Sequence, residues 1–261
     1  MNFTKPKIAA LLAEFLGTGF LTLVFLSVSN SSVGLPYFTA IAVGLLVSMA
    51  ALAIGPISGA HINPAVTFAK WTVRKIDTLQ GILYIAFQVL GAIAALRLFE
   101  YFVGKSLPAM AARNFEWRTL VAEAVGTLVL TIGVAAAIYN DYDRLTNAAV
   151  KGMSYMLGIV IASVAANGIL NPAVALGLHS FSRAYWIGPL VGAIVGMNVY
   201  TYIFAARENI VPLTFRRNRV KNAEASSVTT KVKSTAAAKP AGRASSATKS
   251  TKAKTTAKKK R

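Results

Sequence analysis

Long apolar segments alternate with short polar ones along most of this chain. A helix of about 20 residues covers the roughly 30 Å of a bilayer's hydrocarbon core. The first segment is too long for the apolar region of a signal peptide, so we expect it to be retained. The pattern predicts six transmembrane helices, at about 8–28, 38–56, 79–103, 117–139, 147–166 and 184–206.

Two weaker apolar stretches, about 63–72 and 171–180, are too short to cross a membrane alone. Each begins with the same word, Asn-Pro-Ala-Val. Asparagine is a good N-cap and proline suits the first helical turn, so each stretch predicts a half-helix that starts at the word. Its positive dipole end would then point at the middle of the membrane, where it repels cations. The predicted central constriction is Asn63, Pro64 and Ala65 with Asn171, Pro172 and Ala173.

The repeat extends beyond this word. Residues 13–18 match 122–127, and 91–93 match 192–194. Each half holds three spans, so the two halves enter the membrane from opposite sides, which makes an inverted repeat. The predicted fold is an all-α membrane protein with six transmembrane helices and two re-entrant half-helices. Its channel domain covers 8–206, with repeats at about 8–103 and 117–206.

Composition agrees with a membrane protein, because 55% of the 261 residues are hydrophobic and only 14% are charged. The chain has no cysteine, which excludes disulfides and thiolate metal sites. It has two histidines, His61 and His179. We therefore expect no catalytic residue, no metal and no bound cofactor, and we do not expect an enzyme.

Positive charge sets the expected orientation. Lys and Arg gather in 1–7, 70–75 and 144–151, and residues 207–261 carry 16 of the 28 Lys and Arg residues. Both termini are therefore predicted to be cytoplasmic. The tail has no apolar periodicity and is predicted to be disordered. Three readings of the tail stay open: a solvated extension, contact with anionic lipid, and contact with nucleic acid.

These motifs together resemble the aquaporin family of water and small-solute channels. The resemblance covers about residues 8–206. It rests on specific residues: Ala-Glu-Phe-Leu-Gly-Thr at 13–18, Ser-Gly-Ala-His-Ile-Asn-Pro-Ala-Val-Thr at 58–67, Gln88, Gly91, Ala-Glu-Ala-Val-Gly-Thr at 122–127 and Asn-Pro-Ala at 171–173. It implies a homotetramer in the plasma membrane, with a single-file pore in each subunit for water and small neutral solutes.

The resemblance also implies roles for the loops before the half-helices. Backbone carbonyls would form a ladder of acceptors, contributed by Gly59, Ala60, His61, Asn167, Gly168 and Ile169. Glu14 and Glu123 would brace the loops through backbone N–H groups, and a proton relay is the alternative for these intramembrane carboxyls. For His61 we prefer a structural hydrogen bond to pH gating. Arg97 and Glu100, spaced i,i+3, are expected to pair.

The chain departs from the family at the outer filter. By the resemblance, Arg usually follows the second Asn-Pro-Ala, where this chain has Val174. The matching filter positions are Val43, Ile159, Gly168 and Val174, none of them charged or aromatic. They predict a wider, apolar mouth that admits glycerol, urea, ammonia or hydrogen peroxide. A side chain from the outer loops that restores a narrow mouth is the alternative.

Two other classes of function remain open in the sequence. One is an adhesive, structural or tethering membrane protein in the same fold with little flux. The other is a secondary transporter, which is disfavoured because the spans offer no charges near the midplane beyond Glu14 and Glu123. The predicted function is therefore a passive channel that excludes protons and cations at the paired Asn-Pro-Ala motifs.

Overall fold

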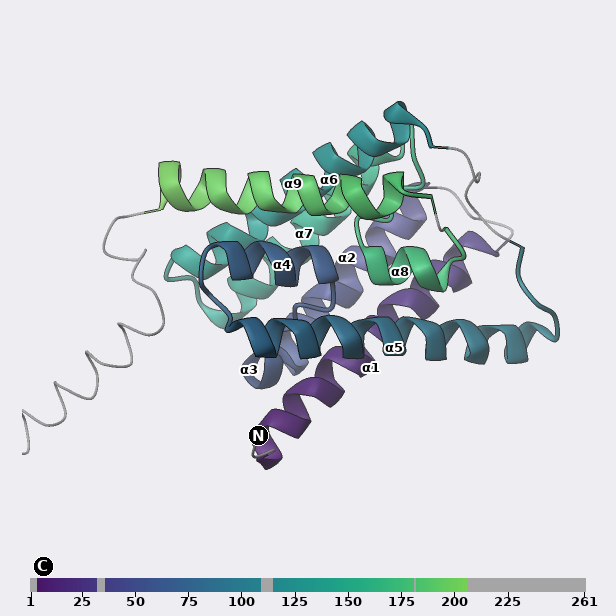
Figure 1. Cartoon of the computed structure of the whole chain (residues 1–261), viewed down its shortest axis with the longest axis horizontal. Helices are drawn as coiled ribbons and strands as arrows, with labels where there is room; N and C mark the ends of the chain where they lie inside the picture. The colour runs from purple at the N-terminus through teal and green to yellow at the C-terminus, as the bar shows by residue number, and fades with distance from the viewer. Residues whose placement is uncertain (1–3, 32–35, 109–114, 181, 206–261) are drawn as a thin grey trace, which may run out of the picture. The chain divides into compact units, whose positions relative to one another are not determined.

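A computed structural model describes residues 4–31, 36–108, 115–180 and 182–205 of the chain (Figure 1). The basic tail, 207–261, lies outside these residues. The described part is helical, without a strand. The helices are α1 (Lys5–Ser29), α2 (Pro36–Ala53), α3 (Gly55–Ser58), α4 (Pro64–Thr72), α5 (Thr78–Val103), α6 (Trp117–Tyr139), α7 (Arg144–Ala162), α8 (Pro172–Gly177), α9 (Ala184–Val199) and a π-helical turn η1 (Tyr200–Phe204).

Six of these elements are long and apolar enough to cross a membrane: α1, α2, α5, α6, α7 and α9 with η1. This confirms the six predicted spans. The sequence missed the break after Ala53, where Pro56 opens the separate short helix α3. It also began the fifth span too late, because the carboxylate of Asp143 caps α7 by accepting the N–H of Leu145 at 2.9 Å. The Thr146 hydroxyl and the N-terminal N–H groups hold the pKa of Asp143 below its usual range.

Small residues bring the long helices into close contact at equivalent places of the two halves. A Cβ on Gly91 of α5 would lie 2.2 Å from the carbonyl oxygen of Phe15 on α1. A Cβ on Gly192 of α9 would lie 1.9 Å from the carbonyl oxygen of Ala124 on α6. Neither position has room for any side chain. The repeated Gly-Ala-Ile motif at 91–93 and 192–194 therefore reflects backbone contact between helices.

The two short helices α4 and α8 lie between α5 and α9 (Figure 1). Both contact α5 and α9, and they also contact each other. We call the end of the helix bundle at which α1 begins the near side and the opposite end the far side. Chain direction then places the ends of α2, α4 and α6 at the near side and the ends of α7 and α8 at the far side.

Candidate functional site

The loops before α4 and α8 share an unusual backbone. In the first loop Ala60 and Ile62 have φ values of 46° and 42°. In the second loop Gly168 and Leu170, at the matching positions, have φ values of 64° and 57°. Left-handed φ is disfavoured for residues with a side chain, and most of all for β-branched Ile62. Such a backbone persists only where its surroundings hold it.

Two buried carboxylates hold these loops. Glu14 on α1 accepts the N–H groups of His61 and Ile62 at 2.9 and 2.6 Å. Glu123 on α6 accepts those of Ile169 and Leu170 at 2.9 and 2.7 Å. Both carboxylates are fully buried. These are the hydrogen bonds that the predicted bracing role requires.

The first loop has a second layer of polar contacts. The Ser58 hydroxyl donates to Glu14 at 2.6 Å, and the Gln88 amide donates to Glu14 at 2.8 Å and to the Thr67 hydroxyl at 3.0 Å. His61 Nδ1 lies 3.1 Å from the same hydroxyl. Because that hydroxyl donates to the Asn63 carbonyl, we assign the proton to His61 Nδ1. His61 therefore makes the structural hydrogen bond that we preferred.

The two asparagines tie the loops to each other. Asn63 Nδ2 donates to the carbonyl oxygen of Leu170 at 2.9 Å, and Asn171 Nδ2 donates to that of Ile62 at 2.9 Å. Each side-chain oxygen caps its own half-helix, accepting the N–H of Ala65 or Ala173. Each amide group has two N–H donors and uses one on the opposite loop. The Asn171 side chain also interacts with the Tyr155 hydroxyl.

The carbonyls of the predicted ladder differ in their partners. Within the described residues, no hydrogen bond uses the carbonyl oxygen of Gly59, Ala60, His61, Asn167 or Gly168. The sixth, Ile169, accepts the Tyr155 hydroxyl at 3.0 Å. A backbone carbonyl without a protein partner needs water or a solute as its partner, so these five acceptors along two loops suit a path for hydrogen-bonding solutes.

A cavity of about 20 Å³ lies beside the first loop, on the near side. Loop residues 59–62 line it together with apolar side chains of α2, α4 and α6. Two lysines also line it, Lys70 of α4 and Lys151 of α7. From the sequence, we expect Lys70 in the loop after the second span and Lys151 near the start of the fifth. In the structure Lys70 instead belongs to α4 and is only 8% exposed, and Lys151 lies two turns inside α7, which begins earlier than predicted.

The structure buries the side chains at the predicted filter positions on the far side. Val43, Ile159 and Val174 belong to one buried cluster, and each has an exposed fraction of 0%. Leu107, from the loop after α5, packs against that cluster. A Cβ on Gly168 would meet the Ile159 carbonyl oxygen at 2.9 Å, so the glycine faces α7 closely. The predicted filter positions are therefore surrounded by close-packed, mostly apolar side chains.

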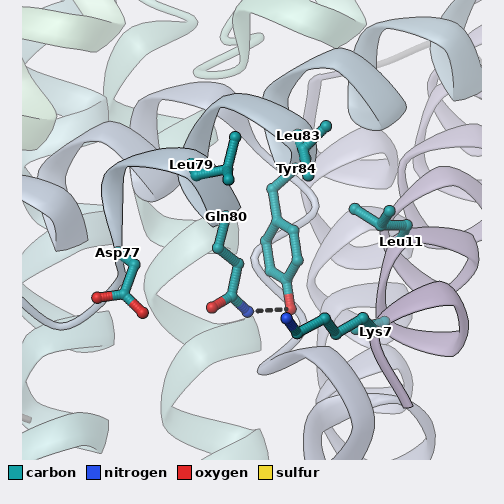
Figure 2. Close-up of a pocket in the computed structure, with 8 residues that line it drawn as sticks. Lys7, Leu11, Asp77, Leu79, Gln80, Leu83 and Tyr84 are labelled. Atoms are coloured by element: carbon teal, nitrogen blue, oxygen red, sulfur yellow. Dashed lines mark hydrogen bonds between the residues drawn. The ribbon is translucent and has the colours of Figure 1, made fainter. Parts of the chain in front are cut away.

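A larger cavity, of about 190 Å³, lies outside this path (Figure 2). Lys7 and Leu11 of α1 face Gln80 and Tyr84 of α5 across it. Gln80 donates to the Tyr84 hydroxyl, which donates to the Ser58 carbonyl at 3.0 Å. This cavity therefore borders the bracing network of the first loop but contains none of the predicted pore residues.

The remaining predicted residues lie outside the two loops. Arg97 and Glu100 form an ion pair at 2.8 Å, as expected from their spacing. His179 Nδ1 lies 3.2 Å from the Leu107 carbonyl oxygen. Among the residues that the structure describes, no group of three His, Cys, Asp or Glu side chains could hold a metal ion.

Comparison with known proteins identifies the family to which this fold belongs. Residues 2–200 match the family model of the major intrinsic protein. The chain belongs to that family. It is 32% identical over 214 residues to aquaporin-5 of Mus musculus, covering 74% of this chain and 80% of that one. It is 33% identical over 213 residues to aquaporin-2 of Ovis aries, covering 74% and 78%.

A solved structure shares the fold. The aquaglyceroporin from Plasmodium falciparum superposes with a TM-score of 0.59 at 21% identity, covering 76% of this chain and 96% of that one. Membership in the family and the six apolar helices make this chain an integral, multi-pass membrane protein. It is a passive channel for water or small solutes, and it is not an enzyme.

Proposed function

We propose that solutes cross this channel in single file between the two loops, past the side-chain amides of Asn63 and Asn171. The single observation that carries the proposal is the reciprocal pair of hydrogen bonds between the asparagines and the opposite loops, both at 2.9 Å. They fix the two amides side by side at the starts of α4 and α8. Two helix N-termini that face each other there repel protons and other cations.

We further propose that Val43, Ile159, Gly168 and Val174 form the far-side constriction. Its support is the complete burial of three apolar side chains at the positions that sequence reasoning assigned to the filter. An apolar constriction offers no donor to replace a solute's hydration shell, so it selects by size and by the free energy of removing water. Ions and strongly hydrated solutes are excluded, and small uncharged solutes pass.

The test is Val174→Arg in reconstituted vesicles, with water, glycerol, urea and ammonia compared by stopped flow. The new guanidinium fills the constriction and adds donors that suit water. We expect uncharged solutes other than water to slow by on the order of tenfold relative to water, which corresponds to about 1.4 kcal/mol of added barrier. Val164→Arg is the matched control, because Val164 is 88% exposed.

An unchanged solute profile in Val174→Arg would remove Val174 from the constriction. A wild-type protein that raised none of these fluxes would instead favour an adhesive or tethering role. A proton current comparable to solute flux would contradict the central barrier.

The remaining assignments are part of the same proposal. We place both termini in the cytoplasm of a plasma-membrane protein and the subunits in a homotetramer, as the family resemblance implies. We assign the basic tail, 207–261, to contact with anionic lipid, because clustered Lys and Arg near a membrane bind such lipid at roughly 1 kcal/mol per residue. Protease protection in sealed vesicles tests the orientation, and mass photometry tests the tetramer. Vesicle flotation with and without the tail tests the lipid contact.

A further inference from the structure

The near-side cavity contains an arrangement that the proposed channel function does not use. Lys70 and Lys151 approach it from two different helices, α4 and α7. Lys70 Nζ lies 3.6 Å from the point where a Cβ on Gly59 would stand, so its ammonium group lies against the first loop. Ionisable groups at membrane depth are expensive to bury and normally have a partner.

No carboxylate of the described residues forms an ion pair with either lysine. Among the described residues the one ion pair is Arg97–Glu100, which involves neither lysine. Glu14 is the acidic group whose charge acts on Lys70. Its two oxygens are already occupied by four donors, Ser58, Gln88 and the N–H groups of His61 and Ile62. His61, with its proton assigned to Nδ1, adds no counter-charge.

Protonating both lysines in this one cavity costs free energy, because the two ammonium groups would repel each other and burial removes their hydration. A mobile anion between them would lower both costs. The cavity has room for about one water-sized occupant, since a single water needs roughly 10–15 Å³ of such space and about 20 Å³ is present. Its opposite wall is apolar, formed by Val47, Val66, Leu130 and Val134. Polyatomic and strongly hydrated anions do not fit this space.

We propose that Lys70 and Lys151 form a binding site for one small monovalent anion, of halide size, in the near-side half of the pore. An occupied site blocks a single-file path, so halide concentration controls flux. The flux readout rests on the proposed function of the pore, whereas a direct binding readout does not. The positive charge of the two lysines repels cations on the near side. In family members with the filter Arg, the corresponding positive charge lies on the far side.

The experiment measures water permeability of reconstituted wild-type protein by stopped flow, in sodium bromide and in sodium gluconate of equal osmolarity. Gluconate is too large for the site. We expect about a tenfold loss of water permeability at a bromide concentration about ten times Kd, where mass action fills about nine sites in ten. Sulfate is expected to act like gluconate.

The variant Lys70→Met with Lys151→Met should abolish the bromide effect while water still passes in gluconate. Lys7→Met is the matched control: it removes one positive charge from the same side of the protein, but Lys7 lines the other cavity (Figure 2). It should respond to bromide as the wild type does. Size-exclusion chromatography of each variant reports whether it folds.

Anomalous scattering from bromide in crystals of the wild type locates the ion without any flux. A peak between Lys70 Nζ and Lys151 Nζ supports the site, and its absence overturns it. A bromide effect that survives in the double variant, or wild-type flux equal in bromide and gluconate, also overturns it. If the wild type passes no water in gluconate but shows the bromide peak, the anion site is supported and the proposed channel function is contradicted.

Discussion

The loops before α4 and α8 have matching backbones but different surroundings. Both carry left-handed φ at the same two positions, and both place two N–H groups on a buried carboxylate. Around the first loop, Ser58, Gln88 and Thr67 add side-chain hydrogen bonds. Around the second loop, the hydroxyls of Thr119, Tyr155 and Tyr185 make hydrogen bonds to its backbone, and the rest of its surroundings include apolar packing.

This difference separates what the two repeats must share from what each is free to change. The strained backbone needs a carboxylate below it and an asparagine across from it, so both halves keep these groups. The side chains around each loop carry no such constraint. Beside the first loop, Lys70 and Lys151 line a cavity together with apolar side chains, whereas the buried side chains at the predicted filter positions near the second loop are apolar.

The largest expected effect tests the close helix contacts that the two halves share. Gly91→Ala and Gly192→Ala each put a Cβ about 2 Å from a backbone carbonyl oxygen, closer than any real contact. Backbone cannot yield without separating two long helices, so we expect both variants to lose the folded protein. Gly55→Ala is the control, because a Cβ there meets nothing within 4 Å. Detergent-resistant monodisperse protein is the measurement, and survival of just one variant would show that the halves are not equivalent.

A smaller effect sharpens the difference between the loops. Glu14→Ala leaves four donors without their acceptor, whereas Glu123→Ala leaves the N–H groups of Ile169 and Leu170. Unsatisfied buried donors cost about 1–3 kcal/mol each, although freed side chains can turn elsewhere. We expect Glu14→Ala to lower the thermal unfolding midpoint more than Glu123→Ala, and exposed Glu116→Ala to leave it unchanged. The reverse order would mean that the second layer of contacts does not stabilise the first loop.

The smallest expected effect concerns Asn63 and Asn171, whose hydrogen bonds are nearly the same in the two halves. Asn63→Ala and Asn171→Ala each remove one bond between the loops and one helix cap, a loss of about 1–2 kcal/mol. The two bonds join the same pair of loops, so the double variant should lose less than the sum of the single variants. Unfolding midpoints of the three proteins measure this coupling. Strict additivity would mean that the bonds act independently.

Much of the architecture could be predicted from local sequence. Apolar run length predicted the six spans, and Asn-Pro at two places predicted the starts of α4 and α8. The predicted span ends were less accurate. A helix cap such as Asp143 or a helix break such as Pro56 acts over a few residues and hardly changes the mean hydropathy of a 20-residue segment. The tail and the other undescribed residues leave their predictions untested.

The site was predicted less completely. Glu14, Glu123 and the asparagines were found because the repeat marks them twice. For Lys70 and Lys151 the sequence indicated only a role in orientation, since a lysine near a span end usually marks the cytoplasmic side. A signal was present: Lys151 falls inside an apolar span, and Lys70 follows Val66 by one helical turn. The width of the far-side mouth could not be read from residue types, because it depends on how four distant segments pack.

The sequence by itself determined the class of this protein. Segment length, the repeated word and the capping chemistry of Asn-Pro are local properties, and each acts within a turn or a span. Only the tertiary structure decided which groups meet. The bonds of Asn63 and Asn171 join residues 107 and 109 positions apart, and Lys70 and Lys151 line one cavity although they belong to different halves of the chain. Contacts of that range depend on the packing of whole helices, which no local pattern specifies.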